Sequence, residues 1–214
     1  MRVTRVHVDV PLDTGMEIDL PEGAARHVAR VLRLGAGDAL RLFNGQGGEY
    51  DADIQAVRRD VVTLRIGLHH AVERESPLRI VLLQGIARGE KMDLILQKAT
   101  ELGVHAFVPV KMARSTVRLD ERAALARQQH WQAVVASACE QSGRNGVPPV
   151  HDAASLAQWI QANPPAPAAA VATPLRLLLS LQPDARPLRE AAAGDAAVWL
   201  LSGPEGGLAP EEEA

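Results

Sequence analysis

The chain has 214 residues, a formal net charge of −3, and 47% hydrophobic and 23% charged residues, which is ordinary for a globular protein. This length fits one large domain or two small ones. The single cysteine, Cys139, excludes an intramolecular disulfide and a multi-cysteine metal site, and it suits a cytoplasmic protein. No apolar segment is long enough for a transmembrane helix, and the amino terminus does not resemble a signal peptide.

Short alternating segments in the first 70 residues predict β-strands. Within residues 2–10, Val6, Val8 and Val10 share one face, and polar residues occupy the other face. The same alternation predicts further strands at residues 39–43, 50–56 and 62–68. Short strands separated by turns are typical of a small antiparallel barrel or sandwich.

A helix is predicted between the first two of these strands, at about residues 21–34. Its apolar stripe consists of Val28, Val31 and Leu32. A second face carries basic residues at helical spacing: Arg26, Arg30 and Arg33. Such a face is either a binding surface or an ordinary solvated helix face.

The pattern changes after the polar segment 69–77, which predicts an interdomain linker. Nearly continuous apolar runs predict buried strands, and helical patterns alternate with them. The strands are expected at residues 78–86, 106–110, 175–181 and 196–201, and the helices at 91–102, 120–141, 154–161 and 187–193. The helix at 91–102 has Leu94 and Leu102 on its predicted apolar stripe. Strand–helix alternation predicts a parallel sheet with helices on both faces, and the Pro/Ala-rich segment 163–174 predicts a surface loop.

Several common sites are absent from the sequence. No GxGxxG motif follows the first buried strand, and there is no GxxxxGK[ST] phosphate-binding motif. The histidines lack the spacing of a metal site, so no metal is expected. A nucleotide-binding oxidoreductase is therefore disfavoured.

Polar segments do occur at the predicted ends of the later strands. They are residues 85–91, Arg114 with Ser115, residues 140–145 and residues 203–207. If they share one edge of the sheet, they form a cleft with basic side chains and backbone donors. Each also has a simpler explanation: Gly143 is suited to a left-handed helix cap, and Arg88 and Arg114 to surface positions.

The segment Leu200–Leu208 has the strongest local pattern. An apolar strand runs into Gly203-Pro204-Glu205-Gly206-Gly207, and Pro210 is suited to the first position of a helix. Glycines let the backbone adopt left-handed conformations and let a ligand approach closely. The alternative is a tight strand-to-helix connection without a ligand.

These segments carry a resemblance to a known family. The matching residues are 27–33, 37–38, 43–50, 91–93, 97–104, 114–115, 140–144 and 203–207. Their order and spacing resemble the RsmE-type 16S ribosomal RNA uracil-N3 methyltransferases, of the SPOUT class.

The resemblance implies an α/β protein with a small β-barrel. Residues 1–70 would form a PUA-like RNA-binding barrel, and residues 78–214 a SPOUT-type parallel α/β domain with a trefoil knot. A later family segment rich in Gly, Pro, Leu and Arg has no counterpart before Ala214. We therefore expect a truncated methyltransferase domain whose cofactor is weakly held or absent. Ala209 also replaces the usual serine, so the last helix lacks its side-chain cap.

The resemblance also implies S-adenosyl-L-methionine as the cofactor and 16S rRNA or the small ribosomal subunit as the partner. The implied cofactor-binding residues are Leu179, Leu181, Gly203, Pro204, Glu205, Gly206 and Gly207. The implied RNA-binding residues are Arg26, His27, Arg30, Arg33 and Arg88. A homodimer is expected, with no membrane partner.

Transfer to uracil N3 requires removal of a proton and stabilisation of the uracil anion. Arg114, Glu140 and Arg144 are the candidate catalytic residues, with Glu205 as a second candidate base. The competing hypothesis is an RNA-binding module without methyl-transfer activity.

Overall fold

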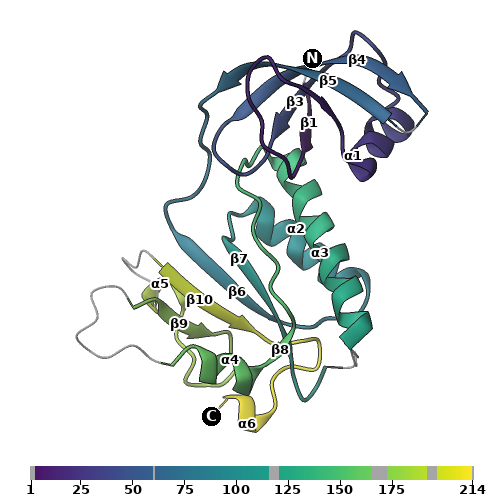
Figure 1. Ribbon diagram of the computed structural model, residues 1–214. Helices are drawn as coiled ribbons and strands as arrows, with labels where there is room; N and C mark the ends of the chain where they lie inside the picture. The colour runs from purple at the N-terminus through teal and green to yellow at the C-terminus, as the bar shows by residue number, and fades with distance from the viewer. Residues whose placement is uncertain (1–2, 60, 116–120, 165–172, 192–196, 214) are drawn as a thin grey trace. The chain divides into compact units, whose positions relative to one another are not determined.

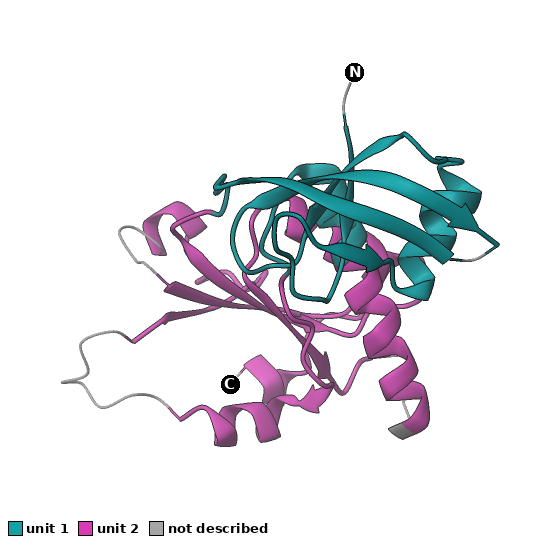
Figure 2. Cartoon of the chain, turned by 45° about the horizontal axis from the view of Figure 1, so that its top comes forward, with its two compact units in different colours: residues 1–75, 136–147 teal, residues 76–135, 148–214 magenta. Residues whose placement is uncertain are grey.

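The computed structural model describes residues 3–59, 61–115, 121–164, 173–191 and 197–213. The chain forms two compact units, coloured separately in Figure 2. Unit 1 contains residues 1–75 and 136–147, and unit 2 contains residues 76–135 and 148–214. Residues 2, 120, 165–172, 192–193 and 196, which belong to predicted elements, lie outside the described residues.

Unit 1 is built on a five-stranded sheet with the order β1-β3-β4-β5-β2. Its strands are β1 (Thr4–His7), β2 (Glu17–Asp19), β3 (Ala39–Phe43), β4 (Glu49–Arg58) and β5 (Val61–His70). Three pairings are antiparallel, as predicted, but β1 runs parallel to β3, which the prediction of a small antiparallel barrel or sandwich did not include. The three-residue strand β2 was not predicted, because it is too short to show alternation.

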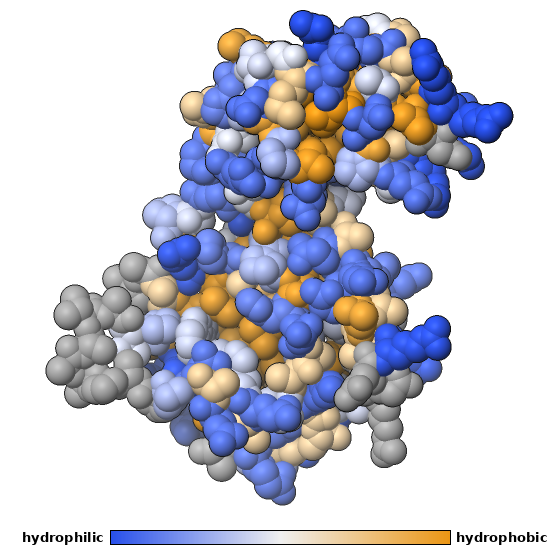
Figure 3. Space-filling model, viewed as in Figure 1, coloured by the Kyte–Doolittle hydropathy of each residue, from blue (hydrophilic) through white to orange (hydrophobic). Residues whose placement is uncertain are grey.

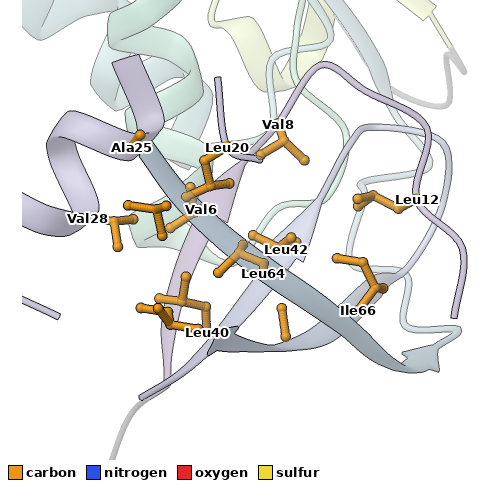
Figure 4. Packing of buried hydrophobic residues seen from close by; sticks show 13 residues of the cluster. Val6, Val8, Leu12, Leu20, Ala25, Val28, Leu40, Leu42, Leu64 and Ile66 are labelled. Atoms are coloured by element: carbon orange, nitrogen blue, oxygen red, sulfur yellow. The ribbon is translucent and has the colours of Figure 1, made fainter. Parts of the chain in front are cut away.

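The core of unit 1 is aliphatic (Figure 4). Val6 on β1 and Val8 just beyond it are each 1% exposed, as predicted, but the strand ends at His7 and Val10 is half-buried. Apolar side chains from every strand and from the helical segment contribute to this cluster, including Val6, Leu20, Val28, Leu42 and Leu64.

The predicted helix at 21–34 is shorter and changes its winding. It consists of α1 (Glu22–Arg26) followed by a π-helical turn, η1 (His27–Val31). The wider turn alters the angular spacing of side chains, so Val28 is buried but Val31 is 66% exposed. Arg33 has φ of 56° and lies beyond the helix, so Arg26, Arg30 and Arg33 do not share the predicted helical face.

Unit 2 contains an all-parallel sheet with the order β8-β7-β6-β10-β9 (Figure 1). The strands are β6 (Arg79–Gly85), β7 (Ala106–Lys111), β8 (Ala154–Ser155), β9 (Leu175–Leu178) and β10 (Ala197–Ser202). The helices are α2 (Glu90–Glu101), α3 (Glu121–Ser142), α4 (Leu156–Ala162), α5 (Leu188–Ala191) and α6 (Pro210–Glu213). The last turns of α3 belong to unit 1. The predicted parallel α/β sheet is confirmed.

Two predictions of burial in unit 2 were wrong. The strand β9 was expected to be buried, but it lies beside β10 at the edge of the described sheet, so Leu178 is 36% exposed. In α2 the buried residues are Met92, Leu96 and Thr100, whereas Leu94 and Leu102 are exposed. Figure 3 accordingly shows hydrophobic residues among hydrophilic ones on the face in view. Among the described residues, no helix has the length and apolar character to cross a bilayer.

Candidate functional site

Three neighbouring strands of unit 2 end at the same edge of the sheet. Because β7, β6 and β10 are adjacent and parallel, the segments 112–115, 86–89 and 203–209 follow their carboxyl ends together. This is the edge at which open parallel sheets bind ligands.

Glycines let these segments pack in direct contact, because a side chain at these positions would collide with the neighbouring segment. A β-carbon on Gly85 would lie 2.6 Å from both the nitrogen and Cδ of Pro204, and 2.8 Å from Met112 Sδ. A β-carbon on Gly206 would lie 3.1 Å from Arg114 Cβ. Gly207 has φ of 69°, in the left-handed region that favours glycine. The backbone of residues 203–207 therefore packs directly on the ends of β6 and β7.

Polar contacts hold the same segments together. The Arg88 amide donates to Glu205 Oε1 at 3.0 Å, and Lys91 Nζ lies 3.6 Å from that oxygen. The Arg88 hydrogen bond is the main reason that the pKa of Glu205 lies below its usual value, and the Lys91 charge adds to the effect. Arg114 Nη1 donates to the Gly206 carbonyl at 3.3 Å, and Gln84 Nε2 donates to the Gly203 carbonyl at 3.1 Å.

A pocket of about 440 Å³ lies beside the glycine-rich loop. All seven predicted cofactor-binding residues line it: Leu179, Leu181, Gly203, Pro204, Glu205, Gly206 and Gly207. The two leucines come from the segment after β9, where the Leu179 amide donates to the Leu201 carbonyl at 2.9 Å. Arg114, predicted from sequence as a catalytic residue, lines the same pocket together with Leu208 and Glu213.

The other two predicted catalytic residues, Glu140 and Arg144, lie in unit 1. Glu140 accepts a hydrogen bond from the His7 amide at 2.9 Å, and burial is the main cause that raises the pKa of this carboxyl. Arg144 is 6% exposed, and its Nε donates to Glu75 Oε2 at 3.0 Å. Gly143 has φ of 88° and donates to the Cys139 carbonyl, so this segment also forms the left-handed cap of α3.

The predicted RNA-binding residues do not form one cluster. Arg26 pairs with Glu22 at 2.5 Å on α1, His27 is half-buried at the start of η1, and Arg30 is exposed on that turn. Arg33 lies beyond the helix. Arg88 is in unit 2, where its side chain is exposed while its amide binds Glu205. In the described part of the chain, no group of three or more His, Cys, Asp or Glu residues could hold a metal ion.

Two family models match consecutive parts of the chain. One describes an RNA methyltransferase PUA domain and matches residues 20–67. The other describes an RNA methyltransferase domain and matches residues 74–214, which is more than half of the chain. A relative named ribosomal RNA small subunit methyltransferase E, from Mycobacterium bovis, is 30% identical over 208 residues that cover 97% of this chain and 78% of its own length. The chain belongs to the ribosomal RNA small subunit methyltransferase E family.

Members of this methyltransferase E family with the same name occur in other bacteria. The Bacillus subtilis relative is 36% identical over 135 residues, which are 63% of this chain and 53% of that relative. The aligned region covers 64% of the relative from Buchnera aphidicola of Schizaphis graminum. The chain thus spans between about half and two thirds of these two proteins.

Solved structures of methyltransferases share the fold over the whole chain. A protein from Legionella pneumophila, described as a methyltransferase in complex with SAM, has a TM-score of 0.91 and 33% identity, covering 100% of this chain and 84% of its own. The methyltransferase E of Neisseria gonorrhoeae, bound to S-adenosyl methionine, has a TM-score of 0.89 and 35% identity, covering 99% of this chain and 84% of its own.

Sequence reasoning about this family member missed several residues around the two regions. Gln84 and Glu213 contact or line the loop pocket, but nothing in their local pattern distinguishes them from strand and helix residues. Leu208 also lines the pocket and ends the segment singled out from sequence, although no role was predicted for it. Arg5 donates to the Arg144 carbonyl in the segment that contains Glu140 and Arg144. The buried Glu49 in turn forms an ion pair with Arg5. Glu49 belongs to the matching segment 43–50, but sequence reasoning gave it no role.

Proposed function

We propose that this chain transfers a methyl group from S-adenosyl-L-methionine to N3 of a uridine in 16S ribosomal RNA. The observation that carries the proposal is the pocket beside Gly203–Gly207, into which backbone groups, an arginine and leucine side chains converge. The bound SAM of the two structural neighbours above supports adenosylmethionine as its ligand.

The pocket residues fit this cofactor chemically. A volume of about 440 Å³ falls within the range of small-molecule sites. Leu179, Leu181 and Leu208 offer apolar surface for an adenine ring. Glu213 offers a carboxylate for the ammonium group. The cofactor would supply the activated methyl group, so the protein has to bind the cofactor, orient the uracil base and remove its N3 proton.

A uracil base has to be exposed and deprotonated before N3 can accept a methyl group. Of the two candidate bases, Glu140 has its pKa raised by burial, which is the direction that strengthens a carboxylate as a proton acceptor. Glu205 has a lowered pKa and is held by the Arg88 amide. We therefore assign proton removal to Glu140.

Arg114 and Arg144 differ in whether their guanidinium groups are exposed to a substrate. Arg114 is exposed, whereas Arg144 is buried and bound to Glu75. We assign stabilisation of the uracil anion to Arg114 and the support of the 140–145 segment to Arg144. Phosphate contacts are proposed for the side chains named from sequence: Arg26, His27, Arg30, Arg33 and Arg88. A homodimer, a cytoplasmic location and a trefoil knot in the α/β domain complete the proposal.

The decisive experiment measures binding and transfer separately. Calorimetry with adenosylmethionine tests the pocket, and incubation with unmodified small subunits followed by mass spectrometry of rRNA nucleosides tests the reaction. Arg114→Ala is expected to lower methyl transfer by about a hundredfold, as loss of a transition-state contact does. Arg122→Ala is the control, because Arg122 is an exposed arginine of α3 outside the pocket.

Each outcome has a definite meaning. A methyl group on N3 of one uridine supports the proposal, and a methyl group on another atom refutes its position. RNA binding without transfer, by a chain that does bind adenosylmethionine, favours the RNA-binding module. Full transfer by Arg114→Ala removes Arg114 from the mechanism.

A further inference from the structure

Unit 1 contains a fully buried carboxylate that the proposed reaction does not use. Glu49, at the start of β4, is 1% exposed. Its oxygens lie 3.1 Å from Arg5 Nε, 3.0 Å from Arg41 Nη1 and 3.3 Å from Arg74 Nη1. Three guanidinium groups from separate segments therefore meet on one carboxylate.

A carboxylate buried in this way persists only with close partners, because removal from water is costly. Burial alone would raise the pKa of Glu49. Hydrogen bonds from Arg74 and Arg41, with the charge of Arg5, outweigh burial and hold the pKa below its usual value. Glu49 is thus ionised and tightly held at neutral pH.

Arg5 uses its remaining donors on the carboxyl end of α3. Its Nη1 donates to the Cys139 carbonyl at 2.8 Å, and its Nη2 donates to the Arg144 carbonyl at 3.0 Å and to Asn145 Oδ1 at 2.5 Å. The last carbonyls of a helix have no partners within the helix and form the negative end of its dipole. A guanidinium is well suited to this position.

Arg74 makes a second contact of the same kind. Its Nη1 donates to the Gly143 carbonyl at 3.1 Å while it also bonds Glu49. The carboxylate of the neighbouring Glu75 accepts hydrogen bonds from Arg144 Nε and from the Gly146 amide. The end of α3 is therefore capped by two arginines that Glu49 holds in place.

We propose that Glu49 is a positioning residue, which through Arg5 and Arg74 holds the Glu140–Arg144 segment in the geometry needed for rRNA. This inference rests on the proposed function. Glu140 hydrogen-bonds His7, two residues after Arg5 on β1, so its carboxyl is set by the same strand. Without Glu49, three arginines would lack their common counter-charge, and the caps on the carbonyls of Cys139, Gly143 and Arg144 would loosen.

The test compares Glu49→Gln, Glu49→Asp and the control Glu17→Gln. Glu17 belongs to the same sheet, but its pair with Arg65 spans 3.5 Å and both side chains are 59% exposed. Glu49→Gln is expected to lower kcat/KM for unmodified rRNA about tenfold or more, as small displacements of reacting groups do. Its Kd for adenosylmethionine should stay within about twofold of the wild type, because the pocket lies in unit 2. Glu49→Asp should recover part of the loss, and Glu17→Gln should match the wild type.

The pH profile separates positioning from mere stability. The groups that act on Glu140 are the His7 amide and the charges of His27 and Arg5. In Glu49→Gln the positive charge of Arg5 is no longer balanced, so the pKa of Glu140 falls. The acid limb of kcat/KM should therefore move to lower pH. A loss of stability that left the surroundings of Glu140 unchanged would leave the acid limb in place.

A folded Glu49→Gln variant with wild-type kcat/KM and an unmoved acid limb would overturn the inference. If that variant does not fold, Arg74→Lys replaces it, because Arg74 is 42% exposed and lysine retains the charge. A lysine cannot bond Glu49 and the Gly143 carbonyl as a planar fork does, so a smaller loss in kcat/KM is expected. Wild-type kcat/KM in Arg74→Lys would likewise overturn the inference. Failure of the proposed function would appear differently, as absent transfer by the wild type itself.

Discussion

The Glu49 cluster of unit 1 and the strand-end pocket of unit 2 are held together by different physical means. Around Glu49, long charged side chains reach from three segments to one buried carboxylate. Around the pocket, glycines remove side chains, so that Pro204 packs directly on Gly85. The ion pair there, Lys91–Glu205, is largely exposed, with side chains 67% and 33% accessible.

This difference predicts which substitutions each region tolerates. The Glu49 cluster should be sensitive to loss of charge at constant shape, because its charges are desolvated and mutually dependent. The pocket should be sensitive to a single added methyl group and nearly indifferent to loss of a surface charge. The following predictions test that contrast in order of decreasing effect.

The largest effect is expected for Glu49→Gln. Breaking a buried ion cluster by removing one partner typically costs about 3–5 kcal/mol, because charges remain buried without compensation. Hydrogen exchange of unit 1 amides, such as those of β4 and β5, should report this loss, while unit 2 amides keep their protection. The exposed pair is the control, and Glu17→Gln should change exchange by less than about 1 kcal/mol. Equal hydrogen-exchange protection in Glu49→Gln and Glu17→Gln would show that the buried Glu49 contributes no more to stability than the exposed Glu17.

The next largest effect is expected for Gly85→Ala. The added carbon would meet Pro204 and Met112 at 2.6–2.8 Å, and such overpacking costs about 1–3 kcal/mol. The loop 203–207 must shift, so affinity for adenosylmethionine measured by calorimetry should fall about tenfold or more. Gly23→Ala on α1 is the control, since nothing lies within 4 Å of the new carbon. Unchanged affinity in Gly85→Ala would mean that the loop position does not determine binding.

A smaller, pH-dependent effect distinguishes the buried Glu49 from the half-buried Glu140 in unit 1. The pKa of Glu49 is lowered from 4.5, so its stabilisation is present above pH 4.5 and is lost as pH falls through the lower folded value. The pKa of Glu140 is raised from 4.5, so the folded state binds the proton more tightly, and stability falls as pH rises through the raised value.

Unfolding free energies measured against pH check both signs. Relative to the wild type, Glu140→Gln should remove the loss of stability above pH 4.5, and Glu49→Gln should remove the loss below it. The same slope in wild type and variant would contradict the assigned direction for that carboxyl.

The smallest effect is expected for Glu205→Gln. Its side chain is exposed and its pair with Lys91 spans 3.6 Å, and surface pairs of this kind contribute little to stability. The amide oxygen can still accept from the Arg88 amide, so adenosylmethionine affinity should fall less than about threefold. Glu101→Gln, which removes a comparable pair with Lys98 on α2, is the control. A loss as large as that of Gly85→Ala would show that charge also organises the pocket.

Much of the fold follows from local patterns. Alternation located β3, β4 and β5 within two residues at each end, and apolar runs located β6, β7 and β10. The glycine-rich loop was recognisable because Gly203, Gly206 and Gly207 have a backbone role that other residues serve poorly. The seven residues expected around the cofactor do line one pocket, although their role in binding is still a prediction.

Other features depended on what packs against each face. Alternation placed Arg5 opposite the core of β1, but the end of α3 covers that face and makes Arg5 a helix cap. Leu94 and Leu102 follow helical spacing yet are exposed, and Leu178 lies on an edge strand. Periodicity specifies which side chains share a face.

By itself, the sequence determined most of the strands, the parallel direction of the sheet in unit 2 and the position of the glycine-rich loop. Tertiary structure alone decided that Gly85 lies under Pro204 and that Glu49 gathers three arginines. Gly85 and Pro204, like Glu49 and Arg5, are more than thirty positions apart in the sequence. The energies of these contacts depend on close packing and on the exclusion of water. A local sequence pattern specifies neither the packing between distant residues nor the exclusion of water.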